Sequence, residues 1–259
     1  MPSWNDIQKQ IVTVESPYDQ VRRNYLRQLE EKTERNVIAY YSGWLQKTSC
    51  GMASIQDNDK DGFMNAIYKM DKKKGLDLIL HTPGGDVAAT ESIGNYLRSI
   101  FGTNIRCYIP QLAMSGGTML ACCSECIIMG KESSIGPIDP QFGGIPAYGV
   151  IEEFEDAQKA LKDDPQSWPA WQVIISKYHP TFIGECYKAI QWSADIASKW
   201  LKSGMFRDDR SGAAKTRKVI AALNNHRDTR SHSRHIDIEE AKSQFQKYWL
   251  SRVNHLFFR

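Results

Sequence analysis

Long apolar runs are absent from the 259 residues of this sequence. A membrane-spanning helix needs about 20 consecutive apolar residues, no segment approaches that length, and the mean hydropathy is −0.48. Residues 1–10 also lack the apolar core of a secretory signal peptide. We therefore expect no transmembrane segment and a cytoplasmic location.

An excess of charge of either sign is also missing. Lysine and arginine number 33 against 30 aspartate and glutamate residues, which gives a formal net charge of +3. Recognition of a nucleic-acid backbone needs a concentrated basic face, and the run Lys72–Lys74 is typical of a solvated helix end. We expect no nucleic-acid partner. The near-neutral total hides an acidic segment at 152–164 and a basic one at 207–234.

Cysteine pairs that would hold a metal are lacking. A single Cys-x-x-Cys segment occurs without a second pair or a spaced pair of histidines. In a chain of this size without a secretion signal, free thiols are favoured over disulfides. We expect no metal and no cofactor, with a metal or redox site at Cys122, Cys123 and Cys126 as the alternative to small buried hydrophobic residues. The six cysteines are Cys50, Cys107, Cys122, Cys123, Cys126 and Cys186.

Strand-like and helical segments alternate through the first half of the chain. Apolar spacing predicts an amphipathic helix over 18–35 and a helix face at 63–70. The remaining pattern predicts buried strands at 36–41, 76–80, 104–109 and 126–129, with helices at 87–100 and 113–123. This order predicts an α/β fold with a largely parallel sheet.

The second half of the chain is mostly helical in pattern. Residues 150–223 indicate helices that are interrupted at 163–169 and near 179–180, and a further helix is indicated at 236–249. We therefore divide the chain into an N-terminal helical segment (1–35), an α/β core (36–149) and a helical C-terminal portion (150–259).

Two glycine-containing turns follow predicted strands. The turn His81–Gly85 precedes a helix, so its backbone N–H groups suit a negatively charged group, although a plain tight turn has the same sequence. The turn Ala113–Thr118 places Ser115 at the first turn of a helix, where glycines clear space around a nucleophilic hydroxyl. The alternative for Ser115 is a helix N-cap.

Adjacent parallel strands would bring these two turns to one edge of the sheet. One turn then supplies an N–H donor, and the other supplies a serine and a second donor. A nucleophile that faces an oxyanion hole is the minimum apparatus for acyl transfer.

Three motifs carry a resemblance to a known family. The segments Leu80–Gly85, Pro110–Thr118 and Ser134–Gln141 resemble successive signatures of the serine dehydrogenase (SDH) proteinase family, which is related to the Clp proteases and the signal-peptide peptidase SppA. The similarity extends over about residues 17–142, and a weaker similarity is present at residues 231–242. It implies a Clp/crotonase fold, a spiral of β-β-α units, and a core (36–149) that is catalytic.

The resemblance also implies roles for individual residues. Ser115 is the expected nucleophile, and the N–H groups of Gly85 and Gly116 are the expected oxyanion hole. Clp proteases keep a histidine in the segment that here is Ile138–Gln141, which contains none. The family's Ser, Asp, His order instead points to Asp139 and His232.

The identity of the general base stays open at this point. His235 and His226 are rivals of His232, and Asp139 could instead contact the serine directly or be only a turn residue. SppA-like enzymes use a lysine, for which Lys159 and Lys162 are placed suitably along the chain. A lysine base needs a lowered pKa, whereas the acidic neighbours in 152–164 would raise it.

We therefore expect a serine endopeptidase-like hydrolase that cleaves a peptide or protein substrate through an acyl-enzyme, with residues 150–259 completing or capping the site. A crotonase-type acyl-coenzyme A enzyme, which uses the same two donors, is one alternative. A non-catalytic Clp-fold assembly or binding module is the other. By analogy with related folds, we expect a homo-oligomer.

Overall fold

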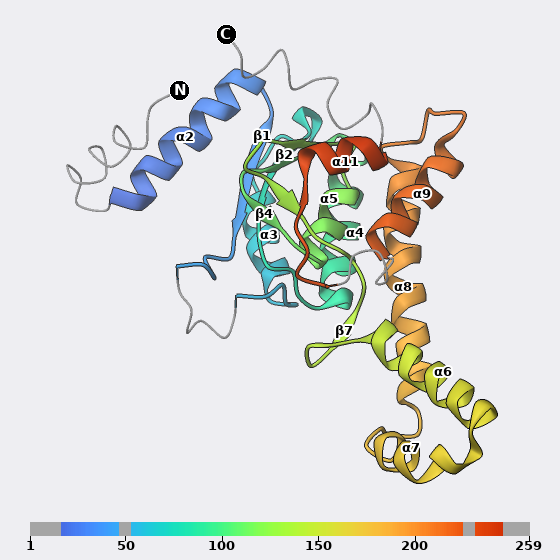
Figure 1. The fold of residues 1–259 in the computed structure, drawn as a ribbon. Coiled ribbons are helices and arrows are strands. Elements are labelled where there is room, and N and C mark those ends of the chain that lie inside the picture. Colours follow the sequence, from blue (N-terminus) through green and yellow to red (C-terminus); the bar gives the residue numbers. More distant parts are fainter. Residues whose placement is uncertain (1–16, 47–52, 225–230, 246–259) are drawn as a thin grey trace.

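A four-stranded parallel sheet lies at the centre of the protein (Figure 1). The computed structural model describes residues 17–46, 53–224 and 231–245. The strands are β1 (Asn36–Tyr41), β2 (Leu76–His81), β3 (Ile105–Ile109) and β5 (Cys126–Met129), in the order β1-β2-β3-β5. Leu76, Leu78 and Leu80 of β2 are fully buried, as expected for a parallel strand covered on both faces.

Helices connect these strands and cover the sheet. They are α2 (Pro17–Thr33), α3 (Asp59–Ile67), α4 (Val87–Phe101) and α5 (Gly116–Cys122), with a short 3₁₀ helix at Lys72–Lys74. The helix α4 begins where the Asp86 side chain accepts a hydrogen bond from the Ala89 N–H (2.8 Å), and it ends at Gly102 with a positive φ of 61°. The predicted α/β arrangement with a parallel sheet is therefore present.

A second, smaller sheet joins three distant segments of the chain. Its strands are β4 (Leu112–Ala113), β6 (Ser134–Ile135) and β9 (Ile236–Asp237). The pairing of β4 with β6 is parallel, and that of β6 with β9 is antiparallel. Because β4 takes up Leu112 and Ala113, α5 begins at Gly116, three residues later than the helix predicted over 113–123.

A helical arm follows a small hairpin of β7 (Gln141–Phe142) and β8 (Ile145–Pro146). The arm consists of α6 (Ala147–Asp163), a 3₁₀ turn at Pro165–Ser167, α7 (Trp168–Ile175) and the first part of α8 (Phe182–Ser203), and Figure 1 shows it projecting from the body of the protein. The predicted helix breaks at 163–169 and near 179–180 are confirmed.

The second part of α8 returns to the core. Trp200 is 1 % exposed, and its ring lies so close to α4 that a Cβ at Gly94 would be 2.5 Å from two ring carbons. The last helices are α9 (Gly212–Asn224) and α11 (Ile238–Phe245). The break between α8 and α9 was not predicted. Among the described residues, no helix is both long enough and apolar enough to cross a membrane.

Four of the five cysteines that the structure describes are buried, and Cys126 is partly exposed. Cys107, Cys122, Cys123, Cys126 and Cys186 form no disulfide with one another, and Cys50 lies outside the described residues. Burial raises the pKa of the Cys122 and Cys123 thiols to about 12. Both thiols are therefore protonated at neutral pH and are poor nucleophiles and poor metal ligands.

A buried carboxylate ties the start of the sheet together. Asp77 on β2 is 0 % exposed, and it accepts hydrogen bonds from Arg35 Nε (2.7 Å) and from Arg106 Nε (2.7 Å) and Nη2 (2.5 Å). Arg35 also donates to the carbonyl oxygens of Leu76 and Asn104. This network fixes the strands that lead to both glycine turns.

Replacing Asp77 by alanine should lower the free energy of unfolding by about 3–5 kcal/mol, because it leaves two half-buried guanidinium groups without their carboxylate. Urea denaturation followed by circular dichroism measures the change. Asp57→Ala is the matched control, since Asp57 is exposed, and it should change stability by less than about 0.5 kcal/mol. Equal effects of the two substitutions would contradict the role given to Asp77.

Candidate active site

The two glycine turns lie against each other. The Thr82 N–H donates to the Leu112 carbonyl, and the Met114 N–H donates back to the Thr82 carbonyl, both at 3.0 Å. Gly84 has a φ of +96°, and a Cβ there would lie 2.6 Å from the Met114 carbonyl oxygen and 2.7 Å from the Ser115 Cβ. Only glycine fits this contact, so the sequence Pro-Gly-Gly is what permits the turns to meet.

Ser115 has a strained backbone. Its φ of 50° and ψ of −115° are unusual for a residue other than glycine. It occupies the N-cap position of α5, yet its side chain makes no capping hydrogen bond. Among the described residues its hydroxyl has no hydrogen-bond partner, so the geometry does not favour the N-cap alternative.

Two backbone N–H groups lie beside Ser115. The Ile55 N–H donates to the Gly84 carbonyl (2.8 Å) and the Asp86 N–H donates to the Ile55 carbonyl (2.9 Å), a pattern that leaves the Gly85 N–H between them unused. The Gly116 N–H is the first of α5. Neither N–H has an acceptor within the part of the chain that the structure describes, and the Gly85 nitrogen lies 3.3 Å from the position of a Cβ at Gly116. Converging, unused N–H donors of this kind can stabilise an oxyanion.

An aspartate–histidine pair forms the other half of the site. His232 Nδ1 lies 2.8 Å from Asp139 Oδ1. The Asp139 side chain is 1 % exposed and that of His232 is 19 % exposed, so the carboxylate is shielded while the imidazole reaches the surface. A histidine held through Nδ1 has Nε2 available for proton transfer.

The small sheet determines on which side the segments carrying these three residues lie. Ala113 pairs with Ile135, and Ile135 pairs with Ile236. Because β4 is parallel to β6 and β9 is antiparallel to it, Ser115, Asp139 and His232 all lie beyond the same end of this sheet.

Thr118 ties two of these segments together. Its hydroxyl oxygen lies 2.8 Å from the Ala113 carbonyl and 2.9 Å from the Gly136 carbonyl, and it accepts the Gly136 N–H at 3.0 Å. Neither Thr118 nor Ile55 was singled out from the sequence, because each acts through local hydrogen bonds that leave no periodic signal.

His81 holds the strand end that precedes the first glycine turn. Its ring stacks on Tyr41 (4.8 Å between centroids) and lies 4.6 Å from the ring of Trp44. Its Nδ1 accepts the Leu112 N–H at 3.4 Å, and burial lowers the pKa of His81, which favours this neutral acceptor form. His81 thereby links β2 to the segment that leads to Ser115.

The rival bases lie elsewhere. His235 is exposed and has no hydrogen bond to a described residue, and His226 lies outside the described residues. Lys159 and Lys162 are exposed on α6, in the projecting arm (Figure 1), and make no hydrogen bond with Ser115. Within the described residues, no cluster of histidine, cysteine and carboxylate side chains could hold a metal ion.

Comparisons with known proteins match this chain to uncharacterised relatives. Two proteins of Methanocaldococcus jannaschii are similar to it, Uncharacterized protein MJ0137 with 34 % identity over 149 residues and Uncharacterized protein MJ1495 with 32 % identity over 146 residues. These matches cover 55 % of this chain in both cases, and 51 % and 50 % of the respective relatives. The chain thus spans about half the length of the curated relatives it matches.

A family model covers a larger part of the chain. Residues 11–177 match the model described as ClpP-like SDH-type serine proteinase. That range includes both glycine turns, Ser115 and Asp139, and it ends before His232. It also agrees with the resemblance seen in the three sequence motifs. The chain belongs to the family of ClpP-like SDH-type serine proteinases.

Proposed function

We propose that this protein is a serine peptidase that cleaves peptide bonds through an acyl-enzyme at Ser115. The observation that carries the proposal is the strained Ser115, whose hydroxyl has no hydrogen-bond partner among the described residues. It lies beyond the same sheet end as the hydrogen-bonded pair of buried Asp139 and partly exposed His232. Membership of a serine proteinase family supports the reaction class.

The proposed reaction follows from this geometry. His232 Nε2 takes the proton of the Ser115 hydroxyl as Oγ attacks the scissile carbonyl carbon. The Nδ1 proton stays on His232, and the Asp139 carboxylate accepts its hydrogen bond and stabilises the imidazolium. The N–H groups of Gly85 and Gly116 stabilise the oxyanion of the tetrahedral intermediate. His232 then protonates the departing amine, and water attacks the acyl-enzyme by the same steps.

The Asp139–His232 pair favours this proposal over the two alternatives. A crotonase-type acyl-coenzyme A enzyme would use the backbone donors without needing a strained serine. A binding module would need neither the strain at Ser115 nor a histidine held by a carboxylate that is 1 % exposed. Both features cost stability and are typical of catalytic sites.

The three parts of the chain have different roles in this proposal. Residues 36–149 supply Ser115, Asp139 and the oxyanion hole, whereas residues 150–259 supply His232 through β9. Residues 1–35 add an outer helix. We also propose that the strands and helices of the core follow the spiral of β-β-α units implied by the family.

A fluorophosphonate probe should label the wild-type protein, because a serine activated by a general base reacts with such reagents. Ser115→Ala should remove the label completely, as measured by in-gel fluorescence and by mass spectrometry of the labelled peptide. Ser99→Ala, which changes an exposed serine on α4, is the control and should be labelled normally. Undiminished labelling of Ser115→Ala would refute the assignment.

The base can be identified by the rate of the same labelling reaction. His232→Ala should slow labelling by about a hundredfold or more, because proton transfer from Ser115 is lost. His235→Ala and Lys159→Ala should label at the wild-type rate, and circular dichroism checks that each variant is folded. Slow labelling of Lys159→Ala together with a wild-type labelling rate for His232→Ala would identify Lys159 as the base instead.

We propose further that the protein is a homo-oligomer. Large apolar side chains are exposed on α7 and α8, namely Trp168, Val173, Ile174, Tyr187 and Trp192. Light scattering should give a mass of at least twice the 29.5 kDa of one chain, and Val173→Asp should reduce it by placing a charge in the contact. A wild-type mass of one chain would contradict the proposal.

A further inference from the structure

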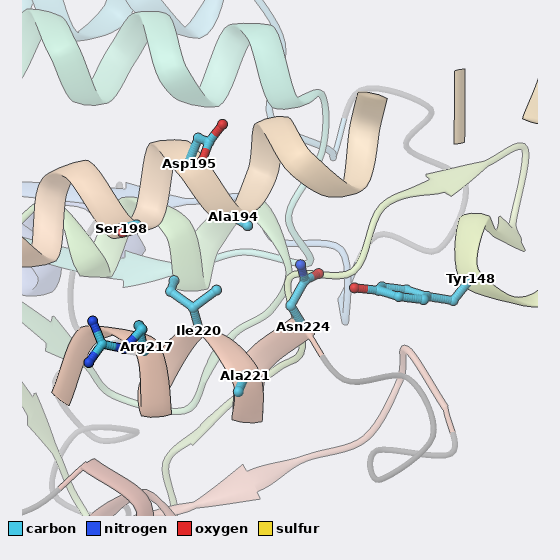
Figure 2. A pocket seen from close by; sticks show the side chains of 8 residues that line it. All are labelled: Tyr148, Ala194, Asp195, Ser198, Arg217, Ile220, Ala221 and Asn224. Atoms are coloured by element: carbon cyan, nitrogen blue, oxygen red, sulfur yellow. The ribbon is translucent and has the colours of Figure 1, made fainter. Parts of the chain in front are cut away.

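A groove runs between α8 and α9 and has no assigned role (Figure 2). Its volume is about 460 Å³, within the range of roughly 300–1,000 Å³ that is usual for ligand sites. Ala194 on α8 and Ala221 on α9 line it with small side chains, Ser198 lies toward the Arg217 end, and Ile220 projects from α9 toward α8 as an apolar contact (Figure 2).

The inner end of the groove carries an unused acceptor. Asn224 is 6 % exposed, and its Nδ2 donates a long hydrogen bond of 3.5 Å to the Ile190 carbonyl. Its Oδ1 has no donor among the described residues. Figure 2 shows this oxygen directed toward the hydroxyl of Tyr148, so two polar groups of the protein face each other there. A buried amide oxygen without a donor is costly, and a ligand N–H group would satisfy it.

The outer end is positively charged. Arg217 is exposed and forms no ion pair with a described residue, and in Figure 2 it lies at the opposite end of the groove from Tyr148. Asp195 on α8 also lines the groove; its carboxylate is directed away from α9 in the same view, and it receives a long hydrogen bond from Gln191. Arg217 is therefore the positively charged side chain that lines the groove, and it lies at this end.

The inner end adjoins the proposed catalytic pair. The Ile138 N–H donates to the carbonyl of Leu223 (2.9 Å), which joins the residue before Asp139 to the residue before Asn224. Burial, and then the negative charge of Asp139, raises the pKa of the Tyr148 hydroxyl. A chain lying in the groove thus approaches the segment that carries Asp139.

The length of the groove fits a short extended peptide. From Arg217 to Asn224, α9 rises about 10 Å, which equals about three residues of extended chain at roughly 3.3 Å each. Peptide N–H and carbonyl groups match the polar inner end, and a carboxylate matches Arg217.

We propose that the groove between α8 and α9 binds an extended peptide segment that carries a carboxylate at Arg217. Peptide binding by the groove is independent of the proposed function. Only the further step, that the bound peptide is part of the substrate, rests on the proposed function. The carboxylate is that of an acidic side chain or of the chain terminus, and both make the same charge-assisted hydrogen bonds with a guanidinium.

Peptide binding can be measured without catalysis, on the full chain with Ser115→Ala. The probes are fluorescein-labelled Ala-Ala-Ala-Glu amide, its glutamine counterpart, and Ala-Ala-Ala-Ala as free acid and as amide. Fluorescence anisotropy should show the carboxylate peptides binding about fivefold more tightly than their neutral counterparts, the upper range for an exposed ion pair. Comparing the glutamate and glutamine peptides tests recognition of a side-chain carboxylate. Comparing the acid and amide forms of the alanine peptide tests recognition of a terminal carboxylate.

Arg217→Ala should abolish this preference. Lys218→Ala is the matched control, because it removes the same charge from the next residue, which does not line the groove, and should leave the preference intact. Ala221→Phe should weaken binding of every peptide by filling the groove. Equal affinity for charged and neutral peptides, no saturable binding, or an equal loss in Lys218→Ala would overturn the proposal. If peptides bind but the fluorophosphonate probe does not label Ser115 of the wild-type protein, the groove proposal is supported and only the proposed function is refuted.

Discussion

The arrangement of the proposed active site depends on the pairing of three two-residue strands. Ala113, Ile135 and Ile236 are neighbours in the sheet β4-β6-β9, and each strand leads to or from one member of the proposed triad. Neither the parallel sheet nor the packing of α8 would place His232 near Asp139. Because so few backbone hydrogen bonds hold this sheet, side-chain ties such as that of Thr118 to Gly136 carry much of the positioning.

The backbone of Ser115 is strained, and the surrounding structure holds it in that conformation. A positive φ at a residue other than glycine costs on the order of 1–3 kcal/mol and persists only where the surroundings fix it. Here the backbone is fixed by the hydrogen bonds of Thr82 with Leu112 and Met114. The close approach of Gly84 to Ser115 adds to this constraint. These contacts thus hold a strained backbone at Ser115, whose hydroxyl has no hydrogen-bond partner among the described residues.

Much of the fold follows from the sequence because long elements repeat a pattern. The strand over 36–41 and the strand ending at Ile109 were located from buried apolar runs, and the meeting of the two glycine turns followed from parallel strand order. The two-residue strands could not be predicted, since two residues show no periodicity. The family resemblance pointed to His232, with His226 and His235 as rivals, because residue type alone does not distinguish three histidines in one segment. The hydrogen bond of His232 to Asp139 depends on the pairing of β9 with β6, which has no sequence signal.

The Asp139–His232 hydrogen bond joins residues 93 positions apart in the chain. Closing a loop of that length costs conformational entropy that only the finished fold repays. The glycine turns, by contrast, belong to strand-and-helix units that are close in the chain and are joined by the hydrogen bonds of Thr82 with Leu112 and Met114. A ribosome therefore completes the serine and its two donors well before it releases the histidine. In the proposed mechanism, a nascent or truncated chain therefore has the oxyanion hole but no general base. It gains peptidase activity only when the segment with His232 and β9 has been added and folded.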